Sequence, residues 1–300
     1  MSAGVPAGGK PRIGVVIPTF NCRHVIMGAI DSLRAQTYPN VHIIIADDGS
    51  TDDTESLLAP LATGDDFTYI KIPNRGVSAA RNTGIRATDD PLVAFLDADD
   101  TLEPDALRSL AAALENDAGA SFASADVLRV YPEHSELRVG APSPGDPLQA
   151  ILERNYVEGG GLFRRPALVE AGLFDESMRA CEDWDLYIRL IERGFLSTYV
   201  PGASYRYVMR GDSITRNELA LVRSFEHLIR KHHAPRARTG HPVFRRLYAH
   251  HLWKIARMYF YVLHMRGKAL SCVLEALVND PVPQRLKRHQ LVAPQPPRSA

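Results

Sequence analysis

The chain has 300 residues, a length that suits one large α/β domain or two small ones. Hydrophobic residues make up 45% of it and charged residues 23%, a composition that excludes a disordered or fibrous protein. The formal net charge is zero, but residues 1–219 hold 20 Lys+Arg against 32 Asp+Glu, whereas residues 220–300 hold 15 against 3. This asymmetry predicts that the acidic residues 1–219 and the basic residues 220–300 contact different partners or environments.

The three cysteines, Cys22, Cys181 and Cys272, are far apart and form no C-x-x-C pair. This spacing argues against a disulfide framework or zinc site and favours a reducing compartment. The first twelve residues lack the apolar stretch of a secretory signal, and no apolar run of about 18 residues predicts a membrane span. We expect a cytoplasmic protein with flexible residues 1–12.

The first hundred residues alternate short apolar runs with helical patterns. Strands are predicted at 13–17, 41–46, 67–72 and 92–96, and helices at 24–36, 54–62 and 77–88. This alternation predicts βαβ units in a mostly parallel, Rossmann-like sheet, whose ligands bind at the carboxyl ends of the strands.

Further elements follow along the chain. We expect a helix at 104–116, a strand at 121–131, a surface loop at 132–147, a helix at 182–193, and strands at 195–200 and 204–209. A helix at 217–231, a linker at 234–242 and helices over 243–278 come next, and residues 281–300 look disordered because of their prolines.

Asp97-Ala98-Asp99-Asp100 directly follows a buried strand. Closely spaced carboxylates repel one another, and Mg²⁺ or Mn²⁺ relieves that repulsion with hard oxygen ligands. Such an ion can help a diphosphate to leave. The alternative is an acidic loop that caps the next helix.

Two other acidic segments carry the same ambiguity. Asp47-Asp48-Gly49-Ser50 is either a plain strand-to-helix turn or a set of carboxylates for a base or ribose. Glu182-Asp183 either complements the dipole of a helix start or supplies a general base to a substrate hydroxyl.

Together these segments resemble a family. The segments that carry the resemblance, which covers about residues 12–216, are Val16-Ile17-Pro18-Thr19-Phe20-Asn21, Asp47-Asp48-Gly49-Ser50-Thr51-Asp52, Gly76-Val77-Ser78-Ala79-Ala80-Arg81-Asn82-Thr83-Gly84, Asp97-Ala98-Asp99-Asp100 and Glu182-Asp183-Trp184-Asp185-Leu186. Their order and spacing are similar to those of the family 2 glycosyltransferases, which have the GT-A fold.

The resemblance implies a domain plan and a set of roles. A GT-A domain would span 13–216, with a nucleotide-sugar half at about 13–103 and an acceptor half at about 104–216, followed by a helical region at 217–280. The nucleotide-sugar would meet Pro18, Thr19, Asn21, Asp47, Asp48, Arg75, Arg81, Asp97, Ala98 and Arg210. Asp99 would bind the metal, Asp183 would be the catalytic base, and Glu182 and Trp184 would shape the acceptor pocket.

The implied chemistry is transfer of a sugar, with inversion, from a nucleotide-diphosphate sugar to a hydroxyl of a glycan or lipid-linked acceptor, with Mn²⁺ or Mg²⁺ as cofactor. Many relatives place a histidine where Arg210 stands, and an arginine's forked donors also suit a diphosphate.

One alternative function stays open, and two others are disfavoured. A non-catalytic sugar-nucleotide or glycan-binding module would have the same fold and remains possible from the sequence. A nucleotidylyltransferase would need a Gly-rich basic signature after the first strand, and a dehydrogenase would need G-x-G-x-x-G there; Pro18-Thr19-Phe20-Asn21 is neither.

The basic C-terminal region contains no recognised nucleic-acid motif, so no nucleic-acid partner is expected. Tyr248, Leu252, Ile255, Tyr259, Val262 and Leu263 recur at helical spacing, which predicts a core face. Lys254, Arg257, Arg266 and Lys268 lie among aromatic residues, a pattern that also suits peripheral contact with the inner membrane surface.

Overall fold

The structure is a computed structural model that describes residues 9–158, 161–209 and 218–281. The chain forms two compact units, Met1–Ser224 and Phe225–Ala300. Most of the flexible N-terminus and of the disordered tail expected from the sequence lies outside the described residues, as does Arg210. The proposed division at 216/217 and the two halves of the first unit remain predictions.

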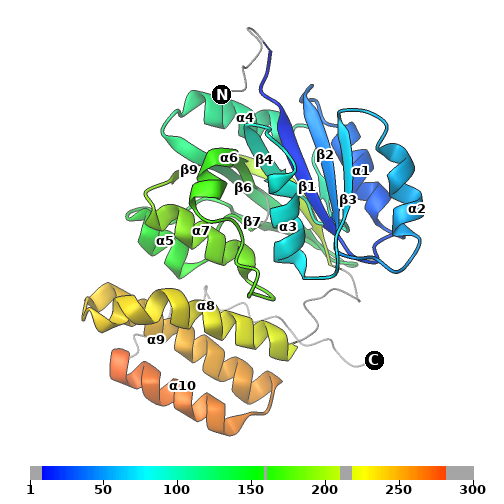
Figure 1. The fold of residues 1–300 in the computed structure, drawn as a ribbon. Coiled ribbons are helices and arrows are strands. Elements are labelled where there is room, and N and C mark those ends of the chain that lie inside the picture. The colour runs from blue at the N-terminus through cyan, green and yellow to red at the C-terminus, as the bar shows by residue number, and fades with distance from the viewer. Residues whose placement is uncertain (1–8, 159–160, 210–217, 282–300) are drawn as a thin grey trace. The chain divides into compact units, whose positions relative to one another are not determined.

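Nine strands in the described part of the first unit form one mixed sheet, in the order β3-β2-β1-β4-β8-β6-β9-β5, with β7 paired to β6 (Figure 1). Their bounds are β1 Ile13–Thr19, β2 Val41–Asp47, β3 Phe67–Lys71, β4 Leu92–Phe95, β5 Thr101–Leu102, β6 Ala120–Val130, β7 Ser135–Arg138, β8 Gly161–Arg164 and β9 Leu196–Val208. The first four strands are parallel to one another, whereas β8 runs antiparallel to both β4 and β6. The expected α/β fold is confirmed.

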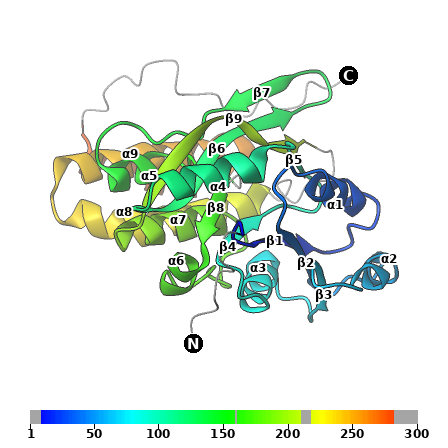
Figure 2. The same cartoon turned by 90° about the horizontal axis from the view of Figure 1, so that it is seen from above.

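Helices cover both faces of this sheet. They are α1 Ile26–Arg34, α2 Thr54–Leu58 with the short η1 Ala59–Leu61, α3 Val77–Arg86, α4 Ala106–Asn116, α5 Pro147–Glu153, α6 Arg165–Glu170 and α7 Glu182–Glu192. Figure 2 shows α1 and α3 on opposite sides of β1 and β2. Strands β1, β2 and β4 are buried on both faces, which explains why they are nearly continuous apolar runs in the sequence.

Each face has its own core because successive strand residues point to opposite sides. Ile13, Val15 and Ile17 of β1 pack in one cluster with residues of α1 and α4. On the other face, the ring of Phe163 stacks on that of Tyr187 at 5.5 Å, while Phe95 meets Phe174 edge-on at 5.0 Å. The aromatic face thus packs α7 against β4 and β8.

Helix α3 approaches β1 very closely, and Gly84 makes this possible. A Cβ atom added at Gly84 would collide with the side chain of Val16. Because α3 carries Arg81, a candidate site residue, this close approach fixes the distance of Arg81 from β1.

Two expectations about the later strands were wrong. Residues 195–209 form one long strand, β9, whose irregular pairing with β6 around Asp126 accommodates Pro201 and Gly202, the residues that suggested a break. The predicted loop at 132–147 contains β7, because the chain turns back and pairs Ser135–Arg138 with β6. An edge strand of four residues, three of them polar, carries little periodicity to detect.

The second unit contains most of α8 (Glu218–Arg238), α9 (Pro242–Arg257), the π-helical turn η3 (Met258–Val262) and α10 (Arg266–Asn279). The prediction that a linker begins at residue 234 is wrong, because α8 continues through Pro235 to Arg238. Ala234 and Ala237 are both buried, so packing of this turn offsets the hydrogen bond that a proline cannot make.

The predicted core face of the second unit is confirmed at Tyr248, Leu252, Ile255 and Tyr259, which are all buried, but Val262 is 40% exposed. A polar cluster adds to this core. Arg230 lies 2.9 Å from both Glu226 and Glu275, and the Tyr259 hydroxyl donates to Glu226 at 2.6 Å. No helix formed by the described residues combines the length and hydrophobicity needed to cross a bilayer.

Two glycine variants test the close approach of α3. Gly84→Ala should destabilise the chain by about 1–3 kcal/mol, because the added methyl overpacks the contact with Val16. Gly28→Ala in α1 is the matched control, since nothing lies within 4 Å of its added Cβ, and it should stabilise by about 0.5–1 kcal/mol. Denaturant unfolding of both variants measures the difference. Equal effects would show that α3 does not depend on Gly84.

Candidate active site

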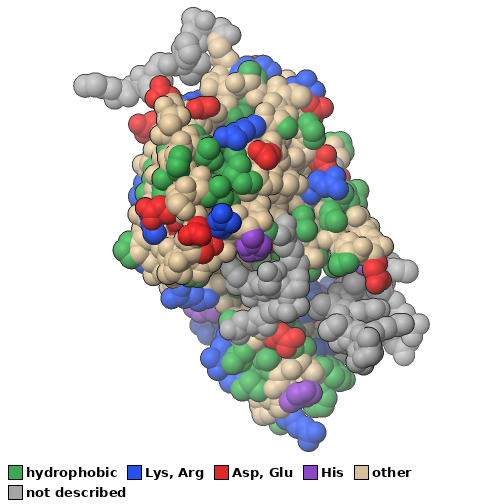
Figure 3. Space-filling view, turned by 90° about the vertical axis from the view of Figure 1, so that its right-hand side faces the viewer, with side chains coloured by type: hydrophobic (Ala, Val, Ile, Leu, Met, Phe, Trp, Pro, Cys, Tyr) green, Lys and Arg blue, Asp and Glu red, His purple; other side chains and the backbone are tan. Residues whose placement is uncertain are grey.

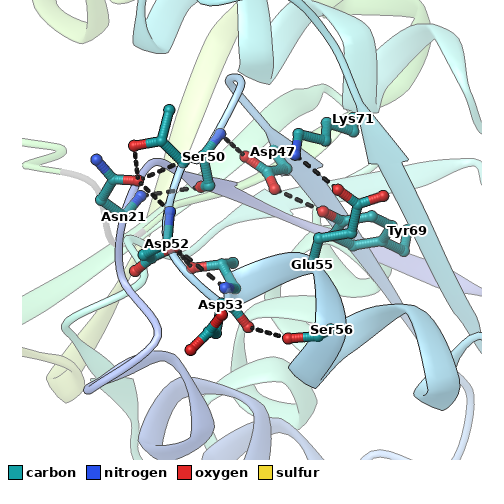
Figure 4. A network of polar contacts seen from close by, with 11 residues as sticks. Asn21, Asp47, Ser50, Asp52, Asp53, Glu55, Ser56, Tyr69 and Lys71 are labelled. Atoms are coloured by element: carbon teal, nitrogen blue, oxygen red, sulfur yellow. Dashed lines mark hydrogen bonds and ion pairs between the residues drawn. The ribbon is translucent and has the colours of Figure 1, made fainter.

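The loops that follow β1 and β2 are joined by a polar network (Figure 4). Asn21 has a left-handed backbone, and its Oδ1 accepts the Thr51 N–H at 2.8 Å while its own N–H donates to the Ser50 hydroxyl at 2.9 Å. Asp47 is fully buried and accepts the Ser50 N–H at 2.7 Å and the Tyr69 hydroxyl at 2.5 Å. Asn21 and Asp47 therefore hold the loops in shape.

Asp48 connects three segments at the strand ends. Its N–H donates to the Thr19 carbonyl at 2.8 Å, and its carboxylate accepts the backbone N–H groups of Arg75 and Gly76, each at 2.7 Å. The start of α3 is thereby tied to β1 and β2. Gly49 permits the turn, because its φ is +81° and a Cβ there would lie 2.9 Å from the Asn74 nitrogen. Pro18 and Thr19 are buried beside it.

Arg81 of α3 bridges two carboxylates from distant parts of the chain. It is only 8% exposed, and its guanidinium lies 2.6 Å from Glu182 at the start of α7 and 2.7 Å from Asp97 after β4. The same group lies over the ring of Phe174. An arginine fork suits this double pairing, which locks α3, α7 and the Asp97 loop together.

The four residues after β4 form a tight turn, in which the Asp100 N–H donates to the Asp97 carbonyl at 3.1 Å. Asp97 and Asp99 are partly exposed, whereas Ala98 and Asp100 are buried. Asp100 accepts the Tyr205 hydroxyl at 2.7 Å, and burial together with the nearby Asp97 carboxylate raises the pKa of Asp100 to about 8. Asp100 therefore stabilises the turn, and the Asp97 and Asp99 side chains reach solvent.

The donor set at this turn fits a hard divalent cation. Within the described residues, no cluster of three or more His, Cys, Asp or Glu side chains could enclose a metal. Mg²⁺ and similar ions are commonly held by one or two carboxylates together with the phosphates of a substrate, so the partly exposed Asp97 and Asp99 would be enough to hold one.

Asp183 occupies the first turn of α7, which places its carboxylate near the Arg81 bridge. Its Oδ2 accepts the side-chain N–H of Asn155 at 2.8 Å, and the side chain is only partly buried. Burial and the adjacent Glu182 charge raise the pKa of Asp183 to about 6, against the opposing effect of Arg81. A carboxylate with this pKa is deprotonated at neutral pH and close to the range expected of a general base.

The side chains of two predicted site residues, Arg75 and Trp184, bind groups outside this centre. Arg75 points its exposed guanidinium to Glu176, at 2.6 Å. Trp184 is buried, and its indole N–H donates to the Ile151 carbonyl at 2.7 Å, so it packs α7 on α5.

Further side chains support the site from several elements. Asn82 donates to both the Phe174 carbonyl and Glu176 at 3.0 Å, which ties α3 to the segment before α7. Tyr205 of β9 contacts Asp97 and Asp100, and Asn155, in the loop after α5, contacts Asp183. These two residues carry no local sequence signal. Only long-range pairing reveals them.

The double pairing of Arg81 can be tested by removing its charge. Arg81→Met should lower the unfolding free energy by about 3–5 kcal/mol, because it leaves Glu182 buried without its cation. Arg86→Met, also on α3 but with a 60% exposed side chain 3.8 Å from Glu176, should cost less than about 1 kcal/mol. Adding Glu182→Leu to Arg81→Met should restore part of the loss. An Arg81→Met chain as stable as the wild type would rule out this bridge.

Comparison with known proteins places the chain among enzymes of one fold. The structure of S. aureus TarS 1–349 in complex with UDP-GlcNAc superposes with a TM-score of 0.63 at 14% identity, covering 90% of this chain and 92% of that one. The mannosyltransferase PcManGT from Pyrobaculum calidifontis, in complex with GDP-Man and Mn²⁺, gives a TM-score of 0.57 at 20% identity and covers 90% and 76%. Both likenesses show the GT-A fold.

Sequence comparison identifies the family. The succinoglycan biosynthesis protein ExoO of Rhizobium meliloti is 30% identical over 220 residues, which cover 69% of this chain and 63% of ExoO. Chondroitin synthase of Escherichia coli is 26% identical over 210 residues, or 70% of this chain and 30% of that protein. The chain thus spans less than two thirds of either relative. The family description "Glycosyl transferase family 2" matches residues 14–170, and the chain belongs to this family.

Proposed function

We propose that this protein is an inverting, metal-dependent glycosyltransferase, which moves a sugar from a nucleoside-diphosphate sugar to a hydroxyl of a glycan or lipid-linked acceptor. The observation that carries the proposal is the position of Asp183. It is a partly exposed carboxylate with a raised pKa, held beside the Arg81 bridge at the carboxyl ends of the strands. Family membership and the relatives in succinoglycan and chondroitin synthesis support the reaction class.

The donor would bind across the ends of β1, β2 and β4. Thr19, Asp48 and Asp97 lie there, and Arg81 is close enough to Asp97 to bear on the same ligand. TarS with UDP-GlcNAc and PcManGT with GDP-Man show that similar folds accept such donors.

Asp99, with Asp97 beside it, would hold Mn²⁺ or Mg²⁺ together with the donor phosphates. When bound, such an ion neutralises the charge that develops on the leaving diphosphate. The side chains of Asp97 and Asp99 contribute the negative charge that attracts the ion to this end of the sheet. Arg81 limits that charge by pairing with Asp97.

Asp183 would act on the acceptor. Its carboxylate takes the proton of the acceptor hydroxyl as the oxygen forms a bond to the anomeric carbon and the bond from that carbon to the diphosphate breaks. A single displacement of this kind inverts the anomeric configuration. Asn155 holds one carboxylate oxygen, and Glu182 raises the proton affinity of the group. The alternative function, a non-catalytic binding module, would make no use of this arrangement.

The role of Asp183 is tested by Asp183→Asn, which keeps the shape of the side chain but cannot take a proton. Transfer should fall by about 10²–10⁴-fold, with donor affinity nearly unchanged, when rate and affinity are measured separately. The wild-type rate should also decrease below pH of about 6, where Asp183 becomes protonated.

Asp185→Asn on the same helix is the control for this test. Asp185 is fully buried and pairs with Arg189 at 2.8 Å, so the variant should lose stability and keep its transfer rate per folded molecule. Near wild-type transfer by Asp183→Asn would show that Asp183 is not the base. A wild-type chain that binds donors but neither transfers nor hydrolyses them would favour the binding module.

Asp99→Ala tests the metal site. Calorimetry with UDP and GDP should show that Mn²⁺ strengthens diphosphate binding to the wild type and has little effect on the variant. Asp89→Ala removes a 93% exposed carboxylate from the loop before β4 and should bind as the wild type does. Metal-dependent affinity that survives in Asp99→Ala would remove Asp99 from the site.

A further inference from the structure

Helix α10 is packed with its small side chains inward and its large apolar side chains outward. Ala269, Cys272 and Ala276 are buried in the second unit. On the opposite side, Leu270 is 59%, Leu274 56%, Leu277 38% and Val278 73% exposed. We call Leu270, Leu274, Leu277 and Val278 the outer leucine face. Their spacing of four, seven and eight residues places them on one stripe of the helix.

The turn before α10 extends this apolar surface. Phe260, Tyr261 and Val262 of η3 are 44%, 68% and 40% exposed. Isolated exposed apolar residues are common, but seven on adjoining elements form a patch of the kind that marks an interaction site. Of the twelve most exposed large hydrophobic residues described in the chain, these seven lie within the last two elements.

The charges in the segment that carries the outer leucine face are mostly positive. Residues 242–281 contain six Lys or Arg and two acidic residues, Glu275 and Asp280. Glu275 does not offset them at the surface, because Arg230 and the Tyr248 hydroxyl already bind it at 2.9 and 2.5 Å. Arg257, Arg266 and Lys268 are exposed beside the patch. Figure 3 shows hydrophobic and basic side chains next to one another on the part of this unit that faces the viewer.

We propose that the outer leucine face, with η3, docks on an anionic lipid surface. Leucines that enter the boundary between headgroups and acyl chains leave water, and the flanking basic residues meet the lipid phosphates. Exposed Tyr261 and Phe260 suit the same interface, where aromatic rings are favoured. The positive charge argues against a second copy of this chain as the occupant, because two such faces would repel. The same positive charge favours a lipid that bears phosphate over an uncharged apolar partner.

The proposal rests on α10 and η3 and does not depend on the proposed transfer reaction. It is tested with the full-length chain and two kinds of vesicle, phosphatidylglycerol and phosphatidylcholine. We expect sedimentation with phosphatidylglycerol at low salt, little with phosphatidylcholine, and release of most of the protein at about 1 M salt, where charges are screened beyond about 3 Å.

Two variants that leave the net charge unchanged distinguish binding through the outer leucine face from nonspecific adsorption to vesicles. Leu274→Gln should weaken vesicle binding by about tenfold or more, because it removes a leucine that is exposed in the free protein and would be buried in the lipid. Leu137→Gln, at a 51% exposed leucine of β7, should bind as the wild type does, and both variants should keep the wild-type melting temperature. Arg266→Gln should reduce the preference for phosphatidylglycerol.

Three results would overturn the proposal. The first is a full-length chain that ignores phosphatidylglycerol vesicles at low salt. The second is equal weakening of binding by Leu274→Gln and Leu137→Gln. The third is self-association, measured by sedimentation velocity, that Leu274→Gln abolishes while vesicle binding persists, since a second copy would then cover this face.

Discussion

The buried guanidinium of Arg81 is the interaction on which the first unit depends most. It joins Asp97, at the end of β4, to Glu182, at the start of α7, across sequence separations of 16 and 101 residues. An arginine at this depth stays charged, so each carboxylate must remain near it or be buried without a partner. The close approach of α3 to β1 at Gly84, and the Asn82 contacts with residues 174–176, keep the arginine where both partners can reach it.

This constraint divides the acidic residues of the site into two groups. Asp47, Asp48 and Asp100 are buried and accept hydrogen bonds from the protein, so they shape the loops after β2 and β4. Asp97, Asp99 and Asp183 reach solvent, and these are the carboxylates that a metal or a substrate hydroxyl can meet. Burial and the adjacent Glu182 charge raise the pKa of Asp183, and Arg81 limits the rise, so the carboxylate proposed as the base has a pKa of about 6.

Local patterns predicted much of the fold and little of this network. The apolar runs of β1, β2 and β4 and the helices α1 and α3 were found because parallel strands and amphipathic helices have distinct periods. Pro235 misled the prediction for α8, since the packing of Ala234 and Ala237 is invisible in the local sequence. The motif that contains Arg81 indicated a ligand contact, whereas its pairing with Glu182 depends on how α3 and α7 fold together. Asn155 and Tyr205 gave no signal for the same reason.

Burial and the adjacent Glu182 charge hold the pKa of Asp183, the proposed base, above its ordinary value, and Arg81 limits the rise. The most direct measurement is an NMR titration of the Asp183 carboxyl group with isotopically labelled aspartate, in the wild type and in Glu182→Gln. We expect a pKa of about 6 in the wild type, and a lower one in Glu182→Gln because the adjacent negative charge is gone. A wild-type pKa near the ordinary aspartate value of about 3.9, or no change in Glu182→Gln, would contradict the account.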